Sequence, residues 1–170
     1  MEETRVVLLK QENPKKQLFA ELVAQQRDME KELTAQARFI KQFQVLAQTE
    51  GELLPMLDHF DCPVAIFERG NVLHSANRVL IEHTDLQTED ILAGKINFLG
   101  RITNENFTML EAAEGVFYGK TALLSRLTYP LELFCKHWNY SVTKDYHRAL
   151  FFPLPDREGH IPFGVVMLMK

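Results

Sequence analysis

CPVAIFERGNVLHSAN, residues 62–77, is the stretch that decides the fold of this chain. Residues 64–67 are apolar and of types that favour strands, and residues 72–76 resume a strand pattern after a short break. The break, residues 69–71, contains Gly70, which can take the positive φ that tight turns require. Two short strands joined by such a turn predict a β-hairpin.

The sequence after the hairpin alternates short helical and strand patterns. Asn77 is expected to start a short helix over residues 79–81, and Thr88 to cap a second helix that stops at Gly94. Residues 129–143 have no clear pattern. A further helix and three strands are predicted at residues 105–117, 121–127, 146–154 and 163–169. The order of elements predicts an α+β domain.

The core of this domain is expected where the sheet packs against the helices. The side chains predicted to be buried on that face are Ile66, Leu73, Leu150, Val166 and Leu168. Shortening one of them to Ala would cost about 2–5 kcal/mol of stability.

The sequence before the hairpin follows a different period. Asn13 and Pro14 form a helix start, because Asn caps free N–H groups and Pro suits the first helical position. Apolar side chains then recur about every 3.5 residues, as in a coiled coil. Gly51 and Pro55 mark the end, so a long helix is predicted over residues 13–56. Its predicted dimer seam comprises Leu22, Met29, Leu33, Ile40 and Phe43.

Two glutamines interrupt this seam. Gln26 and Gln36 weaken it, but buried polar residues at such positions can set the register of a coiled coil. The alternative, a helix that packs on its own domain, stays open. Residues 1–12 form a separate segment, whose apolar run at 6–9 fits a strand or a helix.

The order of these patterns resembles that of a PAS domain. The resemblance is carried by residues 62–67, 72–77, 85–95, 112–121 and 152–166. It covers residues 57–170 and implies an α+β fold, a PAS-like antiparallel five-stranded sheet flanked by short helices and preceded by a long coiled-coil helix. The Asp-Ile-Thr ending usual in PAS domains is absent before Lys170. We therefore expect a fragment cut before an output domain, with a complete small protein as the alternative.

The resemblance implies a ligand pocket between the helix at 105–117 and the strands at 121–127 and 146–154. Such pockets combine an apolar lining with a few polar groups. The expected lining is apolar at Phe107, Leu110 and Leu123, with Tyr146 and His147 as polar partners. The alternative is that these side chains fill the space themselves and leave a solid core.

The sequence identifies no cofactor. Light sensors of the LOV type carry a reactive Cys in a segment to which residues 94–101 are most similar, and this stretch contains none. Haem-binding PAS domains usually supply a His from the helix before the third strand, and residues 105–118 contain none. Noncovalent flavin binding leaves no sequence signature and stays open.

We expect neither a catalytic site nor a metal site. Cys135 and His137 can lie on one side of a strand, but a catalytic pair also needs an orienting third group. His74, His83 and His147 lack the spacing of metal ligands. The chain is therefore not expected to be an enzyme.

Composition excludes several classes of partner. The net charge is −4 and basic residues form no cluster, so direct nucleic-acid binding is not expected. No apolar run reaches the roughly 18 residues of a membrane span. The chain has only two cysteines, Cys62 and Cys135, which fits the reducing cytoplasm.

These patterns together predict a sensory and dimerisation module of a bacterial signal-transduction protein. In this interpretation the domain binds a small ligand or a partner. The homodimeric coiled coil then relays the event to an output domain, in the same or a partner chain. The alternative is a constitutive dimerisation scaffold with no bound ligand, and an enzyme ranks third.

Overall fold

The computed structural model describes residues 14–49, 53–100, 107–135 and 146–170. The chain divides into two compact units, Met1–Gln42 and Phe43–Lys170. The expectations about residues 1–12, about a helix end at Gly51 and about residues 136–143 lie outside the described residues.

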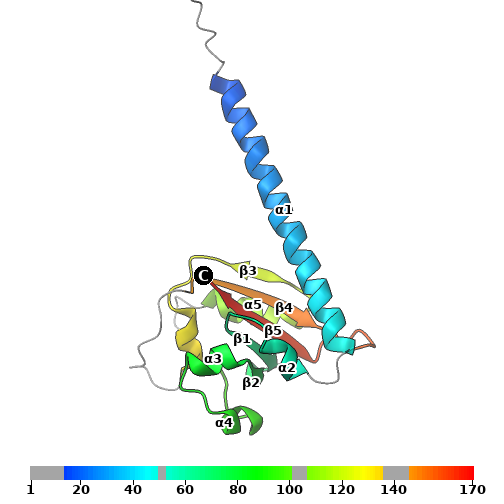
Figure 1. Cartoon of the computed structure of the whole chain (residues 1–170), viewed down its shortest axis with the longest axis vertical. Helices are drawn as coiled ribbons and strands as arrows, with labels where there is room; N and C mark the ends of the chain where they lie inside the picture. The colour runs from blue at the N-terminus through cyan, green and yellow to red at the C-terminus, as the bar shows by residue number, and fades with distance from the viewer. Residues whose placement is uncertain (1–13, 50–52, 101–106, 136–145) are drawn as a thin grey trace, which may run out of the picture. The chain divides into compact units, whose positions relative to one another are not determined.

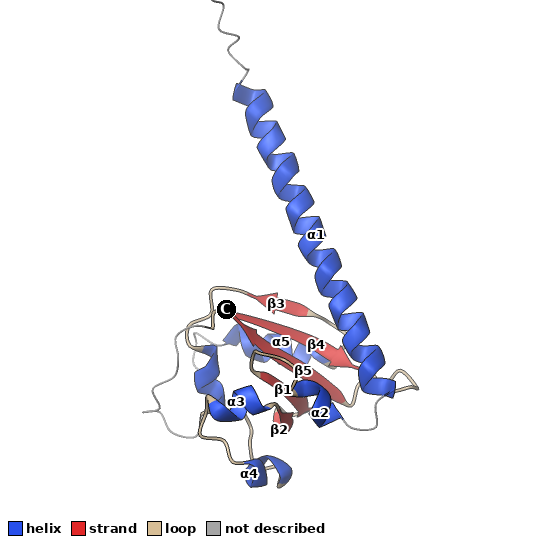
Figure 2. Cartoon of the chain, viewed as in Figure 1, coloured by secondary structure: helices blue, strands red, loops and turns tan. Residues whose placement is uncertain are grey.

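The long helix predicted over residues 13–56 is confirmed from Pro14 to Thr49, but residues 53–57 form the separate helix α2, which contains Pro55 instead of ending there. α1 spans Pro14–Thr49 as one continuous α-helix, and its end from Phe43 onward belongs to the second unit. The remaining helices and strands, labelled in Figures 1 and 2, are α2 (Leu53–Leu57), β1 (Val64–Glu68), β2 (Val72–Ala76), α3 (Arg78–Glu82), α4 (Thr88–Leu92), α5 (Phe107–Val116), β3 (Ala122–Leu124), β4 (Arg148–Leu154) and β5 (Phe163–Met169). A 3-10 helix, η2 (Pro130–Phe134), lies between β3 and β4 in the sequence.

The second unit has the PAS-like α+β fold that the sequence implies. Its five strands form one sheet in the order β2-β1-β5-β4-β3, and all neighbouring strands are antiparallel. Two features depart from the predicted ranges. β3 pairs with β4 only over Ala122–Leu124. Residues 129–143, for which the sequence shows no clear pattern, contain η2.

The hairpin at residues 62–77 is confirmed. β1 and β2 pair antiparallel, with Glu68 opposite Val72 and a bulge after Ile66. Gly70 and Asn71 both take positive φ, at 87° and 63°, which few residues other than Gly, Asn and Asp adopt.

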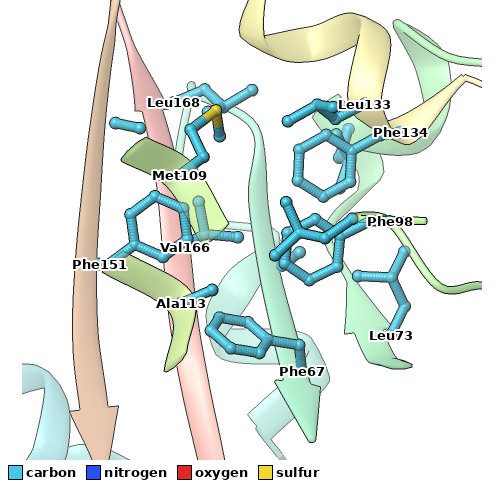
Figure 3. Packing of buried hydrophobic residues seen from close by; sticks show 14 of the residues in the cluster. Phe67, Leu73, Phe98, Met109, Ala113, Leu133, Phe134, Phe151, Val166 and Leu168 are labelled. Atoms are coloured by element: carbon cyan, nitrogen blue, oxygen red, sulfur yellow. The ribbon is translucent and has the colours of Figure 1, made fainter. Parts of the chain in front are cut away.

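One face of the sheet, called the inner face, packs against α5 and η2. Figure 3 shows side chains from separate strands and helices converging there, Phe151 and Val166 from the sheet and Met109 and Ala113 from α5. The buried positions of α5 recur at helical spacing and include two alanines, whose small side chains let the helix approach the strands. This layer is the main core of the domain.

The opposite face of the sheet, called the outer face, is buried too. Two of the five predicted core residues lie on it and not on the inner face. Leu73, Val166 and Leu168 lie in the inner cluster as expected, but Ile66 and Leu150 do not. Ile66 pairs with Val165, and Leu150 with Met167, so both point to the outer face. All five side chains are buried, and the error concerns only the face.

Candidate functional site

The first candidate site is the apolar stripe on the N-terminal part of α1. Most large apolar side chains of this stretch are exposed in the single chain. Phe19 is 69% exposed, Met29 64% and Leu33 60%. The stripe consists of Leu18, Phe19, Leu22, Met29 and Leu33. Exposed apolar side chains that recur along one side of a helix in this way are typical of an interaction site.

The end of α1 differs, because its seam residue Phe43, which belongs to the second unit, is already buried and only 2% exposed. The Phe43 ring contacts Phe60, with ring centroids 5.8 Å apart, and Phe152 of β4, with centroids 5.1 Å apart. The sequence interpretation of Phe43 as a dimer-seam residue therefore needs revision, since this ring packs within its own chain. Leu22, Met29 and Leu33 carry the self-pairing prediction.

Two glutamines attach the end of α1 to the exit of β4. Gln44 Nε2 donates a hydrogen bond to the Pro153 carbonyl at 2.8 Å, and Gln48 Nε2 donates to the Pro155 carbonyl at 3.0 Å. Beyond Phe151, β4 has no pairing with β3, so its carbonyls on that edge are open to side-chain donors. Sequence analysis missed both glutamines. Their i, i+4 spacing places them on one helix face, and that was the signal available.

The turn after β4 contributes a further contact to this junction. Arg157 Nη2 donates to the Gln48 carbonyl at 3.3 Å. The turn itself is closed by Asp156, whose Oδ1 accepts the N–H groups of Glu158 and His160, both at 2.9 Å. Desolvation alone would raise the pKa of Asp156, but these hydrogen bonds and the nearby His160 together lower it below its ordinary value. The carboxylate therefore helps to hold the turn in place.

Asn77 ties the segment after α2 to the sheet. Its side-chain Nδ2 donates to the Cys62 carbonyl at 2.8 Å, and its Oδ1 accepts from the backbone N–H groups of Val64 at 2.9 Å and Leu80 at 3.1 Å. Asn77 is fully buried and caps α3, as the sequence predicted. One amide therefore joins β1, α3 and the chain that enters the domain.

The second candidate site is the space between α5 and the sheet. Aromatic rings occupy it, including Phe67, Phe98 and Phe151 (Figure 3). Phe98 stacks on Phe134 with centroids 5.0 Å apart, and Phe67 meets Phe98 edge to face at 5.2 Å. Rings in these geometries stabilise one another in addition to their burial.

Gly164 allows the Phe67 ring to lie against β5. A Cβ at Gly164 would overlap the end of that ring and would lie 2.8 Å from Cγ1 of Val116. Phe67 and Gly164 are direct partners in the β1–β5 ladder. The inner face is therefore closely packed at this point.

The five predicted pocket residues do not come together. Phe107 is 51% exposed at the start of α5, and His147 is exposed. Leu123 and Leu110 are half-buried, but Leu123 points to the outer face while Leu110 packs against the inner cluster. Only Tyr146 is buried in that cluster. The buried face of α5 is formed instead by Met109, Ala112, Ala113 and Val116.

Groups with possible chemistry lie apart from one another. Tyr146 Oη is 3.2 Å from His83 Nδ1, a hydrogen bond across the domain. Burial raises the pKa of the Cys62 thiol, which keeps it protonated and a weak nucleophile at neutral pH. Cys135 is buried with Sγ 3.6 Å from the Leu131 carbonyl, and His137 lies outside the described residues.

The described ranges contain neither a cluster of metal-binding side chains nor a membrane-spanning helix. Within residues 14–49, 53–100, 107–135 and 146–170, no three His, Cys, Asp or Glu side chains are grouped to hold a metal ion. In those same ranges no helix has the length and apolar character needed to cross a membrane.

Comparison with known proteins gave matches among solved structures only. No protein-family model matches the chain, and no curated protein matches it. A sensory box sensor histidine kinase from Vibrio cholerae is 10% identical, with a TM-score of 0.45, over 82% of this chain and 95% of that one. The LOV protein of Rhodobacter sphaeroides is 13% identical, with a TM-score of 0.49, over 69% of this chain and 63% of that one.

A third solved structure, a variant of Vivid, is 10% identical, with a TM-score of 0.45, over 64% of this chain and 81% of that one. The PAS-like description of the second unit rests on its own sheet order, its antiparallel pairing and its flanking helices.

Proposed function

We propose that this chain is the sensory and dimerisation module of a signal-transduction protein. Its long helix pairs with a second copy and relays changes in the PAS-like domain to an output domain, in the same or a partner chain. The observation that carries the proposal is the exposed stripe on α1, a helix whose other end is attached to the sheet through Phe43, Gln44 and Gln48. We place the module in the cytoplasm, where Cys62 and Cys135 would remain thiols.

Burial of the stripe supplies the driving force for pairing. Fully burying one large apolar side chain contributes about 1.5–3 kcal/mol. Several such side chains, each more than half exposed, lie along the helix from Leu18 to Leu33. A second helix with the same stripe covers them in a continuous coiled-coil seam.

The route of the signal passes through β4. Phe151 points into the inner core, whereas its neighbour Phe152 points outward and contacts Phe43. The next carbonyl along the strand, that of Pro153, accepts the hydrogen bond from Gln44. Any event that shifts β4 from the inner side therefore also shifts the groups that hold the end of α1.

The aromatic packing of the inner face favours sensing through a partner on the outside of the domain over sensing through a ligand in its core. A ligand that entered between α5 and the sheet would have to displace rings such as Phe67 or Phe98. A partner that binds the outside of the domain would not. The same packing also supports the second candidate, a constitutive scaffold that pairs without any ligand. Catalysis forms no part of either proposal.

Two aspartates on the stripe test the pairing. In the double variant Leu22→Asp with Leu33→Asp, each substitution places an unpaired carboxylate in the seam, which is strongly unfavourable. We expect the dimer dissociation constant from light scattering to rise at least about 100-fold, equivalent to about 2.7 kcal/mol.

The matched control is Ala24→Asp with Ala35→Asp, which adds the same charge to exposed positions off the seam. Its dimer should persist. If both double variants remain dimeric, the helices do not pair through this stripe.

Native mass spectrometry distinguishes the sensor from the scaffold. A small molecule that copurifies with the chain, or a metabolite that raises its melting temperature, supports sensing by ligand. A bare polypeptide mass without any thermal shift favours the scaffold or a macromolecular partner.

A further inference from the structure

The turn between β4 and β5, residues 155–162, attaches the end of α1 and also carries titratable side chains. Gln48 Nε2 donates to the Pro155 carbonyl at 3.0 Å and to the Asp156 carbonyl at 3.4 Å. Arg157 Nη2 donates in return to the Gln48 carbonyl. All these residues belong to the second unit. The conformation of the turn therefore determines how firmly the end of α1 is held.

His160 brings an imidazole next to two carboxylates of this turn. Its Nδ1 lies 3.4 Å from Asp156 Oδ2 and 3.5 Å from Glu158 Oε2, so both carboxylates form ion pairs with the imidazole when it is protonated. Asp156 Oδ1 also accepts the backbone N–H groups of Glu158 and His160. The carboxylate that pairs with the imidazole is thus the one that closes the turn.

A second histidine lies where the turn leads into β5. The ring of His74, on β2, and the ring of Phe163 have centroids 4.5 Å apart, and His74 Nδ1 is 3.1 Å from Glu68 Oε1. Glu68 and Phe163 are direct partners in the β1–β5 ladder. A protonated imidazole is attracted to both the carboxylate and the aromatic ring, whereas a neutral imidazole keeps only a weaker hydrogen bond.

The surroundings of the two imidazoles are mostly negative. The carboxylates that face them are those of Glu68, Asp156 and Glu158, and Arg157 is the only lysine or arginine in the turn. Histidine ordinarily gains its charge as pH falls through about 6.5. The number of attractive ion pairs at this end of the sheet therefore changes close to neutral pH.

We propose that the β4–β5 turn makes the attachment of α1 sensitive to protons. While His74 and His160 are protonated, their ion pairs hold the backbone that binds Gln48, and after losing the protons they hold it less firmly. The attachment is therefore strongest in mildly acidic solution and weakens as pH rises through about 6.5. This inference rests on the proposed function, in which the end of α1 relays the signal, and it adds the proton as a stimulus.

Hydrogen exchange at the amides of residues 43–49 tests the attachment in the full chain. After correction for the intrinsic pH dependence of exchange, we expect these amides to exchange about two- to fivefold faster at about pH 8 than at about pH 5.5, because exposed ion pairs are individually weak. Gln does not gain a proton in this range, so the double variant His74→Gln with His160→Gln should exchange at the same corrected rate at both pH values. The amides of α5 are the reference for global stability.

The matched control is His59→Gln. His59 is exposed, and the described part of the chain shows no ion pair of its side chain, so this variant should keep the full pH dependence. Equal corrected rates in the unsubstituted chain at both pH values, or a response that survives in the double variant, would overturn the inference.

The single variant His160→Gln decides the case in which the double variant also exchanges faster in α5 and has therefore lost global stability. The His160 side chain is 73% exposed, so its replacement leaves the core intact. This variant should lose part of the pH dependence at residues 43–49. A full response in it overturns the inference as well.

Light scattering on the same samples separates this inference from the proposed function. Self-pairing without a proton response overturns the inference alone. A proton response in a chain that stays monomeric at all concentrations contradicts the proposed function, and with it the role of the proton as a stimulus.

Discussion

The two faces of the sheet are buried in different ways. The inner face is closed by α5 and η2, and it is lined by rings such as Phe67, Phe98 and Phe151. The outer face is mostly aliphatic and meets the end of α1 through Phe43. The inner contacts stabilise the domain itself. The outer contacts additionally decide how firmly the signalling helix is held, so function in the proposed sense depends on the outer layer.

The largest effect is expected when Phe151 and Phe152, adjacent residues of β4 that point to opposite faces of the sheet, are replaced one at a time. Phe151→Ala and Phe152→Ala each remove a fully buried ring, and each should cost about 3–5 kcal/mol of unfolding free energy. Urea denaturation measures both losses. Only Phe152→Ala should also increase hydrogen exchange at the amides of residues 43–49, because only Phe152 contacts Phe43. Equal exchange in the two variants would mean that the outer face does not hold the helix.

The glutamine contacts provide a smaller test on the outer side. Gln44→Ala with Gln48→Ala removes the side-chain hydrogen bonds to the exit of β4. We expect a loss of about 1 kcal/mol per hydrogen bond, with hydrogen exchange rising at the end of α1 and unchanged in α5. Gln25→Ala with Gln42→Ala, two exposed glutamines of the same helix, is the control and should change neither quantity.

The smallest effect is expected from Asp156 in the turn beside this junction. Its pKa is lowered in the folded chain, so its charge stabilises the fold above the unfolded pKa, and that contribution is lost as pH falls through the folded value. Asp156→Asn keeps an acceptor for the Glu158 and His160 N–H groups but removes the charge. Melting curves should therefore differ between the two chains above the ordinary carboxyl pKa of about 3.9 and converge only as pH falls through the lower pKa of the folded chain. A constant difference across that window would exclude the charge as its cause.

The elements of the fold could be predicted because their signals are local. The turn at Gly70 and Asn71 and the apolar runs on both sides determine a hairpin without reference to the rest of the chain. The 3-10 helix η2 had no such signal, because Tyr129, the residue just before its start at Pro130, has a positive φ of 47°, where Gly is the usual choice.

The faces could not be predicted, and neither could the partner of α1. β1, β4 and β5 are apolar at nearly every position, so the alternation that normally marks the buried face is missing. The sequence pattern therefore does not show that Ile66 and Leu150 point to the outer face. The coiled-coil period likewise continues through Phe43, although this ring packs on Phe152 of its own chain. An apolar repeat in the sequence indicates that a side chain is covered, but it does not show whether a second helix or the chain's own domain covers it.

The predicted pocket residues lie apart from one another for a related reason. Phe107 and His147 came from the boundaries of predicted elements, and end positions of helices and strands are frequently exposed. Tyr146, which lies just before β4, is the one member that reached the inner cluster. The rings that fill that space, Phe67 and Phe98, come from the hairpin strand and from a loop far away in sequence.

The contact between Phe67 and Gly164 also limits how the sheet can assemble. Gly164 lies opposite both Phe67 on β1 and Pro153 on β4, and it leaves no room for a Cβ. A slip of β5 by one residue would reverse its faces and bring Phe163 or Val165 to that position. A slip by two would keep the faces but set Pro162 or Val166 beneath the ring. Only one alignment of the central strand is therefore compatible with a closed core, and the residue without a side chain selects it.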